Sequence, residues 1–255
     1  MPRQARKKSK SGVYHIMLRG INRQTIFEDE EDKARFLYIL FKCVQKSNSN
    51  LYAYCLMDNH VHLLLQETKE PISSVIKRLS SSYVLWYNNK YNRCGHLFQE
   101  RFKSENVETA EYFRTVLRYI HQNPLKAGLS TDVFKCKWTS IHEYSNPDST
   151  LNITASLQLF SNDQTQAHIQ FNDYMSKDAD DTCMDEAPKV KKTDDEVRGY
   201  LKRIGIPNVS QLQQMDKEKR DVILLELKSL NGISERQLSR VTGISRPVIR
   251  GIKKN

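Results

Sequence analysis

The order of strand-like and helix-like segments constrains the fold of this chain more than any other feature. Residues 13–18 form a short β-prone run, and residues 28–46 follow with apolar side chains at helical spacing. Two further strand-like runs, 51–57 and 60–66, are joined by Asp58-Asn59, a dipeptide typical of tight turns. The chain therefore begins with the pattern strand, helix, strand, strand.

The pattern continues with a second helix, a strand and a third helix. Residues 72–91 predict a helix entered by Pro71, and residues 97–107 are extended. A third helix is expected from Thr109, an N-cap candidate, to Gln122, with Asn123-Pro124 ending it. The order β-α-β-β-α-β-α predicts an α+β fold over residues 1–145: a ferredoxin-like antiparallel sheet with helices packed on it.

The periodic pattern decays after residue 145. Residues 146–192 are rich in Ser, Asn, Gln and Thr and include an acidic run at 178–186, which predicts a partly disordered linker with one short helix at most. Helical periodicity returns in residues 193–255, which we expect to form a small all-α domain. Its first clear helix would start at Asp216, bury a stripe of apolar residues and end at Asn231-Gly232. The expected stripe is Val222, Ile223, Leu225 and Leu227.

The end of this domain predicts a helix-turn-helix. Ser234 can cap a helix over 235–241, a tight turn follows at 242–244, and Ser245 can cap a helix over 246–252. The second helix of such a motif enters the major groove with its N-terminal residues reading bases. Arg246 and Arg250 are therefore candidates for base or phosphate contact. The alternative is an ordinary helical hairpin with solvated arginines.

Composition favours a polyanionic partner and a reducing compartment. The chain has 40 Lys and Arg against 30 Asp and Glu, a net charge of +10, which suits binding to phosphates. The five cysteines are scattered without a CxxC pair, which favours the cytoplasm, where a DNA-binding protein would be nucleoid-associated. No apolar run approaches the roughly 18 residues of a membrane helix, so no membrane partner is expected. The basic stretch 2–10 is read as an arm for a phosphate backbone or a solvated tail.

Two local constellations indicate chemistry. His60 and His62 lie two apart in a predicted strand, so both side chains project to one face and can share a divalent cation. Tyr119 and Asn123 lie four apart on a predicted helix and share a face, with Asn123 able to offer an amide oxygen. A tyrosine hydroxyl beside a metal-bound phosphate is a suitable nucleophile. Packing and solvation roles are the alternative for each residue taken singly. His121 is expected to be structural or to contact DNA.

Five stretches together resemble the HUH-type single-strand transposases with one catalytic tyrosine, and especially the REP-associated tyrosine transposase branch. They extend from residue 14 to residue 144 in the order that the family shows. The most specific are His-Val-His at 60–62 and Tyr-Ile-His-Gln-Asn-Pro at 119–124. The five are Tyr14–Asn22, Tyr54–Leu64, Gly95–Phe102, Arg118–Gly128 and Trp138–Tyr144.

The resemblance implies a site and a reaction. His60 and His62 match the paired metal ligands, Tyr119 the nucleophile and Asn123 the third ligand, with Mg²⁺ or Mn²⁺ as the cofactor. Attack by the tyrosine leaves a 5′-phosphotyrosine and a free 3′-hydroxyl, the substrate being single-stranded hairpin DNA. Many members are dimers, so a homodimer is possible. The residues expected near the DNA are Arg19, Gln99, Arg101 and Lys103.

Two departures from the family leave alternatives open. Asp58 stands where relatives often have a small residue or proline, and its carboxylate could join or perturb the metal site. The C-terminal helix-turn-helix is absent from the minimal family; it could bind flanking duplex DNA or mark a host-adopted protein. The rival functions are a DNA-binding regulator, a replication-initiator-like nickase, and a metal-dependent hydrolase in which Tyr119 is incidental.

Overall fold

The computed structural model describes residues 7–99, 101–179, 181, 183–184, 194–230 and 233–252. The chain divides into two compact units, Met1–Asp185 and Glu186–Asn255. The first unit has a buried cluster on each face of a sheet, and the second has a cluster of its own. Most of the predicted N-terminal arm, residues 2–6, lies outside the described residues.

The first unit is built on a four-stranded antiparallel sheet. Its strands are β1 (Val13–Arg19), β2 (Asn50–Met57), β3 (His60–Gln66) and β4 (Lys103–Asn106), in the order β2-β3-β1-β4. This is the order of a ferredoxin-like fold, so the predicted fold class is confirmed. The predicted extended segment 97–107 contributes only β4 and an isolated bridge between Gly20 and Phe98.

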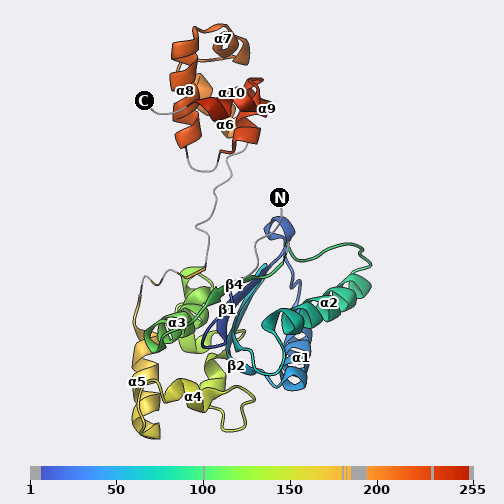
Figure 1. Ribbon diagram of the computed structural model, residues 1–255, viewed down its shortest axis with the longest axis vertical. Helices are drawn as coiled ribbons and strands as arrows, with labels where there is room; N and C mark the ends of the chain where they lie inside the picture. Colours follow the sequence, from blue (N-terminus) through green and yellow to red (C-terminus); the bar gives the residue numbers. More distant parts are fainter. Residues whose placement is uncertain are drawn as a thin grey trace. The chain divides into compact units, whose positions relative to one another are not determined.

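Helices α1 (Glu30–Ser47) and α2 (Ile72–Lys90) cover one face of this sheet (Figure 1). Their apolar side chains pack with alternate residues of the strands, among them Ile16 and Leu63. The alternation follows from the period of two in a strand, which leaves the intervening residues for the opposite face. The ring centroids of Phe36 and Tyr83 lie 5.1 Å apart in an edge-to-face arrangement in the centre of this layer.

Helix α3 (Ala110–Lys126) covers the opposite face (Figure 1). Thr109 caps it as predicted, by accepting a hydrogen bond from the Tyr112 backbone N–H at 3.1 Å. The expected end at Asn123-Pro124 is wrong, because the helix continues to Lys126 with Pro124 inside it. Pro124 lacks a backbone N–H, so the helix loses one hydrogen-bond donor near its end. The packing of α3 on the sheet holds the helix in place despite this loss.

The segment expected to be a linker from residue 146 differs in the structure. It contains α4 (Ile153–Leu157) and α5 (Gln164–Ser176), and α5 packs on α3. Ala167, Phe171 and Met175 recur every four residues and are buried, which gives α5 an apolar stripe that its polar neighbours hide in the sequence. Short 3-10 helices η1 (Ile21–Arg23), η2 (Val133–Lys135) and η3 (Ser140–Ser145) complete the unit.

The second unit is all-helical. Its helices are α6 (Asp194–Arg203), α7 (Val209–Gln214), α8 (Lys217–Ser229), α9 (Glu235–Thr242) and α10 (Arg246–Gly251). In α8 the buried residues are Leu224 and Leu227, whereas Val222, placed in the stripe from sequence, is 65% exposed. The predicted helix end at Asn231-Gly232 lies outside the described residues. In the described part of the chain, no helix has both the length and the apolar composition for crossing a membrane.

The turn between α9 and α10 requires a glycine. Ser234 caps α9 as expected, whereas Ser245 stands at the N-cap of α10 without a side-chain hydrogen bond. Gly243 ends α9 in the left-handed region with φ of 68°. A Cβ there would also lie 2.4 Å from the side-chain nitrogen of Gln213, which donates to the Thr242 carbonyl. The backbone conformation therefore disfavours any other residue, and a side chain would also displace the flexible Gln213 amide from its hydrogen bond.

We predict that Gly243→Ala destabilises the second unit by about 1–2 kcal/mol, because alanine pays the left-handed conformational penalty and meets Gln213. Gly199→Ala is the matched control. Gly199 lies in α6 with open space around its Cβ position, so alanine should stabilise that helix by about 1 kcal/mol. Hydrogen exchange of α8 and α9 in the full chain measures both effects. Equal protection in the two variants would contradict the role given to Gly243.

Candidate active site

Two histidines of β3 face the helix α3 side of the sheet. Leu63 belongs to the cluster under α1 and α2, so His62 and Leu64 point the other way, and Leu64 packs in the cluster under α3. The ring centroids of His60 and His62 lie 5.0 Å apart, and the two ring planes are nearly perpendicular. His62 is fully buried and His60 is partly exposed. The pair therefore projects together, as the strand period predicted.

Helix α3 brings Tyr119 to the same place. The ring centroids of Tyr119 and His62 are 5.6 Å apart, in an edge-on arrangement. Asn123 follows one turn later on the same helix face, and both residues are almost fully buried. Lys126 places its ammonium 5.3 Å from the centroid of the Tyr119 ring. Residues far apart in the sequence thus meet between the sheet and α3.

Sequence reasoning missed a third histidine, His15 of β1. Its Nε2 lies 2.9 Å from Nδ1 of His62, and its ring is 5.7 Å from that of Tyr119. His15 is completely buried. The sequence did contain a signal for His15, which lies two residues from both Val13 and Met17 in an apolar strand. Its side chain must therefore face either the core or a functional site.

The electrostatics of the pocket keep His62 neutral. Burial lowers the pKa of His62 well below its ordinary value, and the neighbouring His15, His60 and Arg19 lower it further. In the tautomer in which Nδ1 of neutral His62 donates to His15, the other ring nitrogen has its lone pair available. That atom, Nε2 of His62, is buried and has no hydrogen-bond partner in the described part of the chain. Such an orphaned nitrogen fits a metal ligand.

The remaining ligands of a divalent cation would have to be oxygens. Among the described residues, no group of three or more His, Cys, Asp and Glu side chains is arranged to hold a metal ion. Asp58, considered from sequence as an additional ligand, is instead 63% exposed and ion-paired to Lys33 at 2.8 Å. The amide of Asn123, water and phosphate oxygens are the donors that could join the two imidazoles. This mixed set suits Mn²⁺ or Mg²⁺.

Three of the four residues predicted to approach DNA in this unit, Arg19, Gln99 and Lys103, lie near the end of β1. The backbone N–H of Gln99 donates to the Arg19 carbonyl at 2.7 Å, so these two residues are adjacent. Lys103 pairs with Met17 across β1 and β4, so both face α3. Gln99, Arg101 and Lys103 are exposed. Except for Arg101, for which only exposure is established, they border the histidine site.

His121 is structural. It is fully buried, its Nε2 lies 2.8 Å from the Ser140 hydroxyl, and burial lowers its pKa to about 3. In the second unit, Arg246 is exposed, and Arg250 is 74% exposed with its Nε 3.5 Å from Glu235. Both arginines are therefore available to an external partner.

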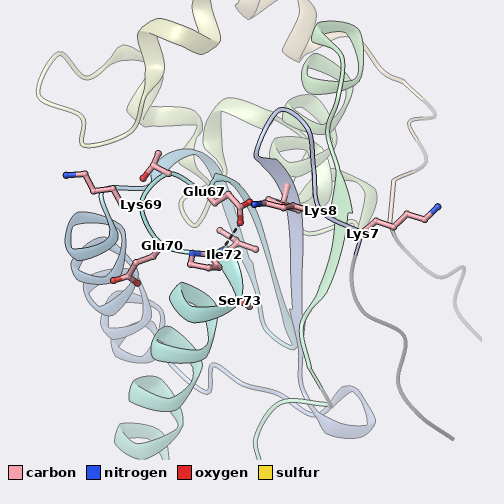
Figure 2. Close-up of a pocket in the computed structure, with 10 residues that line it drawn as sticks. Lys7, Lys8, Glu67, Lys69, Glu70, Ile72 and Ser73 are labelled. Atoms are coloured by element: carbon pink, nitrogen blue, oxygen red, sulfur yellow. Dashed lines mark hydrogen bonds between the residues drawn. The ribbon is translucent and has the colours of Figure 1, made fainter.

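A separate pocket of about 400 Å³ lies at the start of α2 (Figure 2). Glu67, one of its lining residues, accepts a hydrogen bond from the Ile72 backbone N–H at 3.1 Å. Lysines and glutamates line it together, so its charge is mixed. Its lining residues include none of the predicted site residues; they are Lys7, Lys8, Tyr14, Glu67, Thr68, Lys69, Glu70, Pro71, Ile72 and Ser73.

Comparison with known proteins finds a similarity over part of the first unit. The model of the family described as transposase IS200-like matches residues 8–123, which contain β1 through most of α3 and include His15, His60, His62, Tyr119 and Asn123. Over these residues the sequence is therefore similar to the IS200-like transposases. A comparison with curated proteins gave no match.

Two solved structures are similar. A REP-associated tyrosine transposase bound to a REP hairpin is 17% identical with a TM-score of 0.49, covering 57% of this chain and 86% of its own. A protein of Deinococcus radiodurans R1 assigned as a transposase is 17% identical with a TM-score of 0.34, covering 51% of this chain and 100% of its own.

Proposed function

We propose that the chain cleaves and rejoins single-stranded hairpin DNA through a covalent 5′-phosphotyrosine on Tyr119. The observation that carries the proposal is the contact of Tyr119 with His62, one of the histidine pair of β3, inside a region similar to the IS200-like transposases. A hydrolase that used the histidines only to activate water would not need a buried tyrosine against them. The net charge of +10 is consistent with a nucleic-acid partner.

The proposed reaction exchanges one phosphodiester for another. The Tyr119 oxygen attacks the scissile phosphorus, the bond from phosphorus to the 3′ oxygen breaks, and the departing 3′ oxygen takes up a proton. The phenol proton leaves to solvent. The reverse attack by a 3′-hydroxyl restores a phosphodiester and frees the tyrosine. No external energy source is needed, because the phosphotyrosine conserves the bond.

The protein contributes position and charge to this reaction. His60, His62 and Asn123 would hold Mg²⁺ or Mn²⁺, which when bound polarises the phosphoryl oxygen. Helix α3 fixes the direction of Tyr119 by packing on the sheet, and the ammonium of Lys126 adds positive charge near its ring. Arg19, Gln99 and Lys103 would contact the DNA strand as it enters.

The test is covalent trapping with labelled single-stranded hairpins from the DNA flanking the gene. With Mn²⁺ we expect a protein–DNA band that resists denaturant, and with chelator or in Tyr119→Phe we expect none. Tyr38→Phe is the control, since Tyr38 is an exposed residue of α1, which covers the other face of the sheet. His60→Ala and His62→Ala should lose the band yet keep measurable hairpin binding.

The outcomes separate the rival functions. Cleavage that persists in Tyr119→Phe would establish a hydrolase and refute the tyrosine mechanism. Tight hairpin binding without any covalent band in the wild type would favour the DNA-binding regulator. Nicking without rejoining would favour a nickase of the replication-initiator kind.

We also propose that the second unit binds duplex DNA flanking the hairpin. The turn at Gly243 and the following short helix place Arg246 in the first turn and Arg250 one turn later, both exposed. Residues on the first turns of such a helix can reach base edges and phosphates.

We predict that replacing Arg246 and Arg250 by glutamate weakens duplex binding by the full chain roughly 10-fold or more and flattens its salt dependence, because two phosphate contacts are lost. Replacing Lys202 and Arg203 at the end of α6 is the charge-matched control. Fluorescence anisotropy at several salt concentrations measures both. Equal losses in the two double variants would mean that net charge alone, not α10, determines binding.

A further inference from the structure

A carboxylate faces the buried histidine that sequence reasoning missed. In the antiparallel pairing of β1 with β4, Glu105 lies directly opposite His15, so both side chains point toward α3. Nδ1 of His15 and Oε2 of Glu105 are 3.9 Å apart. Both atoms are buried, and neither has a hydrogen-bond partner among the residues that the structure describes. The ring nitrogen and the carboxylate oxygen are therefore complementary in charge and hydrogen-bonding capacity.

The surroundings of Glu105 keep its carboxyl group ionised. His15 lowers the pKa of Glu105 most, and hydrogen bonds from Tyr112 and the Met184 backbone N–H lower it further, against the effect of burial. In return, burial and the hydrogen bond to Glu105 raise the pKa of Tyr112. A negative charge facing Nδ1 of His15 favours a proton on that nitrogen.

The position of that proton determines the state of His62. When the His15 imidazole carries a single proton, on Nδ1, its Nε2 is an acceptor, and the 2.9 Å contact is then a hydrogen bond donated by Nδ1 of His62. Nε2 of His62 then has its lone pair free. With the opposite tautomers, His15 would donate to Nδ1 of His62, and Nε2 of His62 would carry a proton and could not be a ligand.

We propose that His15 and Glu105 are positioning residues, which hold His62 in the tautomer and orientation whose Nε2 lone pair can bind the catalytic cation. The proposal rests on the proposed function for the identity of that cation. Outer partners of metal-binding histidines commonly fix their ligand in this way, and their loss typically costs 10–100-fold in metal affinity. The series Glu105, His15, His62 crosses the three strands β4, β1 and β3 within one layer of the sheet.

The first readout is the tautomer of His62 in metal-free protein, from long-range ¹H–¹⁵N correlation spectra of the seven histidines. We expect protonated Nδ1 in both His15 and His62 of the wild type. In His15→Phe, which keeps a buried ring but removes the acceptor, His62 should shift toward the tautomer with protonated Nε2. In Glu105→Leu the preference at His15 should weaken. Protonated Nε2 on His62 in the wild type would overturn the proposal.

The second readout is Mn²⁺ affinity, measured by the loss of the free-ion signal in electron paramagnetic resonance. His15→Phe should weaken binding about 10–100-fold, and His15→Gln, whose amide oxygen can replace the acceptor, should recover part of it. His121→Phe is the matched control, because His121 is also fully buried but bonded to Ser140 instead. It should lower thermal stability without changing Mn²⁺ affinity.

The outcomes distinguish this proposal from the proposed function. Unchanged Mn²⁺ affinity in folded His15→Phe would refute the positioning role and leave Tyr119 chemistry intact. Equal losses in His15→Phe and His121→Phe would indicate general destabilisation and also refute it. If the wild type binds no Mn²⁺ or Mg²⁺, the metal assignment fails. In that case, a His62 tautomer that still depends on His15 would support only the proposed directions of the hydrogen bonds.

Discussion

The antiparallel pairing of β1 with β3 runs from Val13 opposite Gln66 to Arg19 opposite His60. This register places Met17 opposite His62 and therefore His15 diagonal to it, within reach of a 2.9 Å contact. A slip by one residue would turn the side chains of one strand to the face under α1 and α2. Because both strands are buried on both faces, such a slip would also place the side chains of one strand in the wrong core. The packing that stabilises the sheet thus also sets the geometry of the site.

The sheet separates structural and chemical roles between its two faces. The face under α1 and α2 is apolar and aromatic, with Phe36 and Tyr83 at its centre. The face under α3 contains apolar residues as well, but it also buries His15, His62 and Tyr119. Burying these polar groups costs free energy unless they are paired, and the pairs they form are with one another. Nε2 of His62 is one of the buried nitrogens without a hydrogen-bond partner among the described residues, and an external cation bound there would compensate part of this cost.

The fold of the first unit could be predicted from sequence because its strands and helices have clear periods. The bounds of β3 follow from its strand-like run over residues 60–66, and the ferredoxin-like fold follows from the order of strands and helices. Helix α5 could not be predicted in the same way, because its stripe of Ala167, Phe171 and Met175 is embedded in polar residues and is stabilised by contact with α3. The end of α3 was misplaced because tertiary packing overrides the local signal of Pro124.

The site was only partly predictable for a related reason. The predicted site residues form two short motifs whose spacing can be interpreted within one element. His60 and His62 lie two apart in a strand, and Tyr119 and Asn123 lie four apart on a helix. His15 and Glu105 each stand alone in their segments, and only the pairing of three strands brings them to His62. Their partnership depends on register, which no local spacing encodes.

The most direct measurement of the central claim, that the histidine pair and Tyr119 form one metal centre, is ¹⁹F NMR of protein labelled with 3-fluorotyrosine. Mn²⁺ broadens nearby resonances, and Tyr119 can be assigned among the twelve tyrosines by its replacement with Phe. We predict that substoichiometric Mn²⁺ broadens the Tyr119 resonance while that of Tyr38, an exposed residue of α1, stays sharp, and that His62→Asn abolishes the effect. A sharp Tyr119 resonance with bound Mn²⁺, or the same broadening in His62→Asn, would contradict the shared centre.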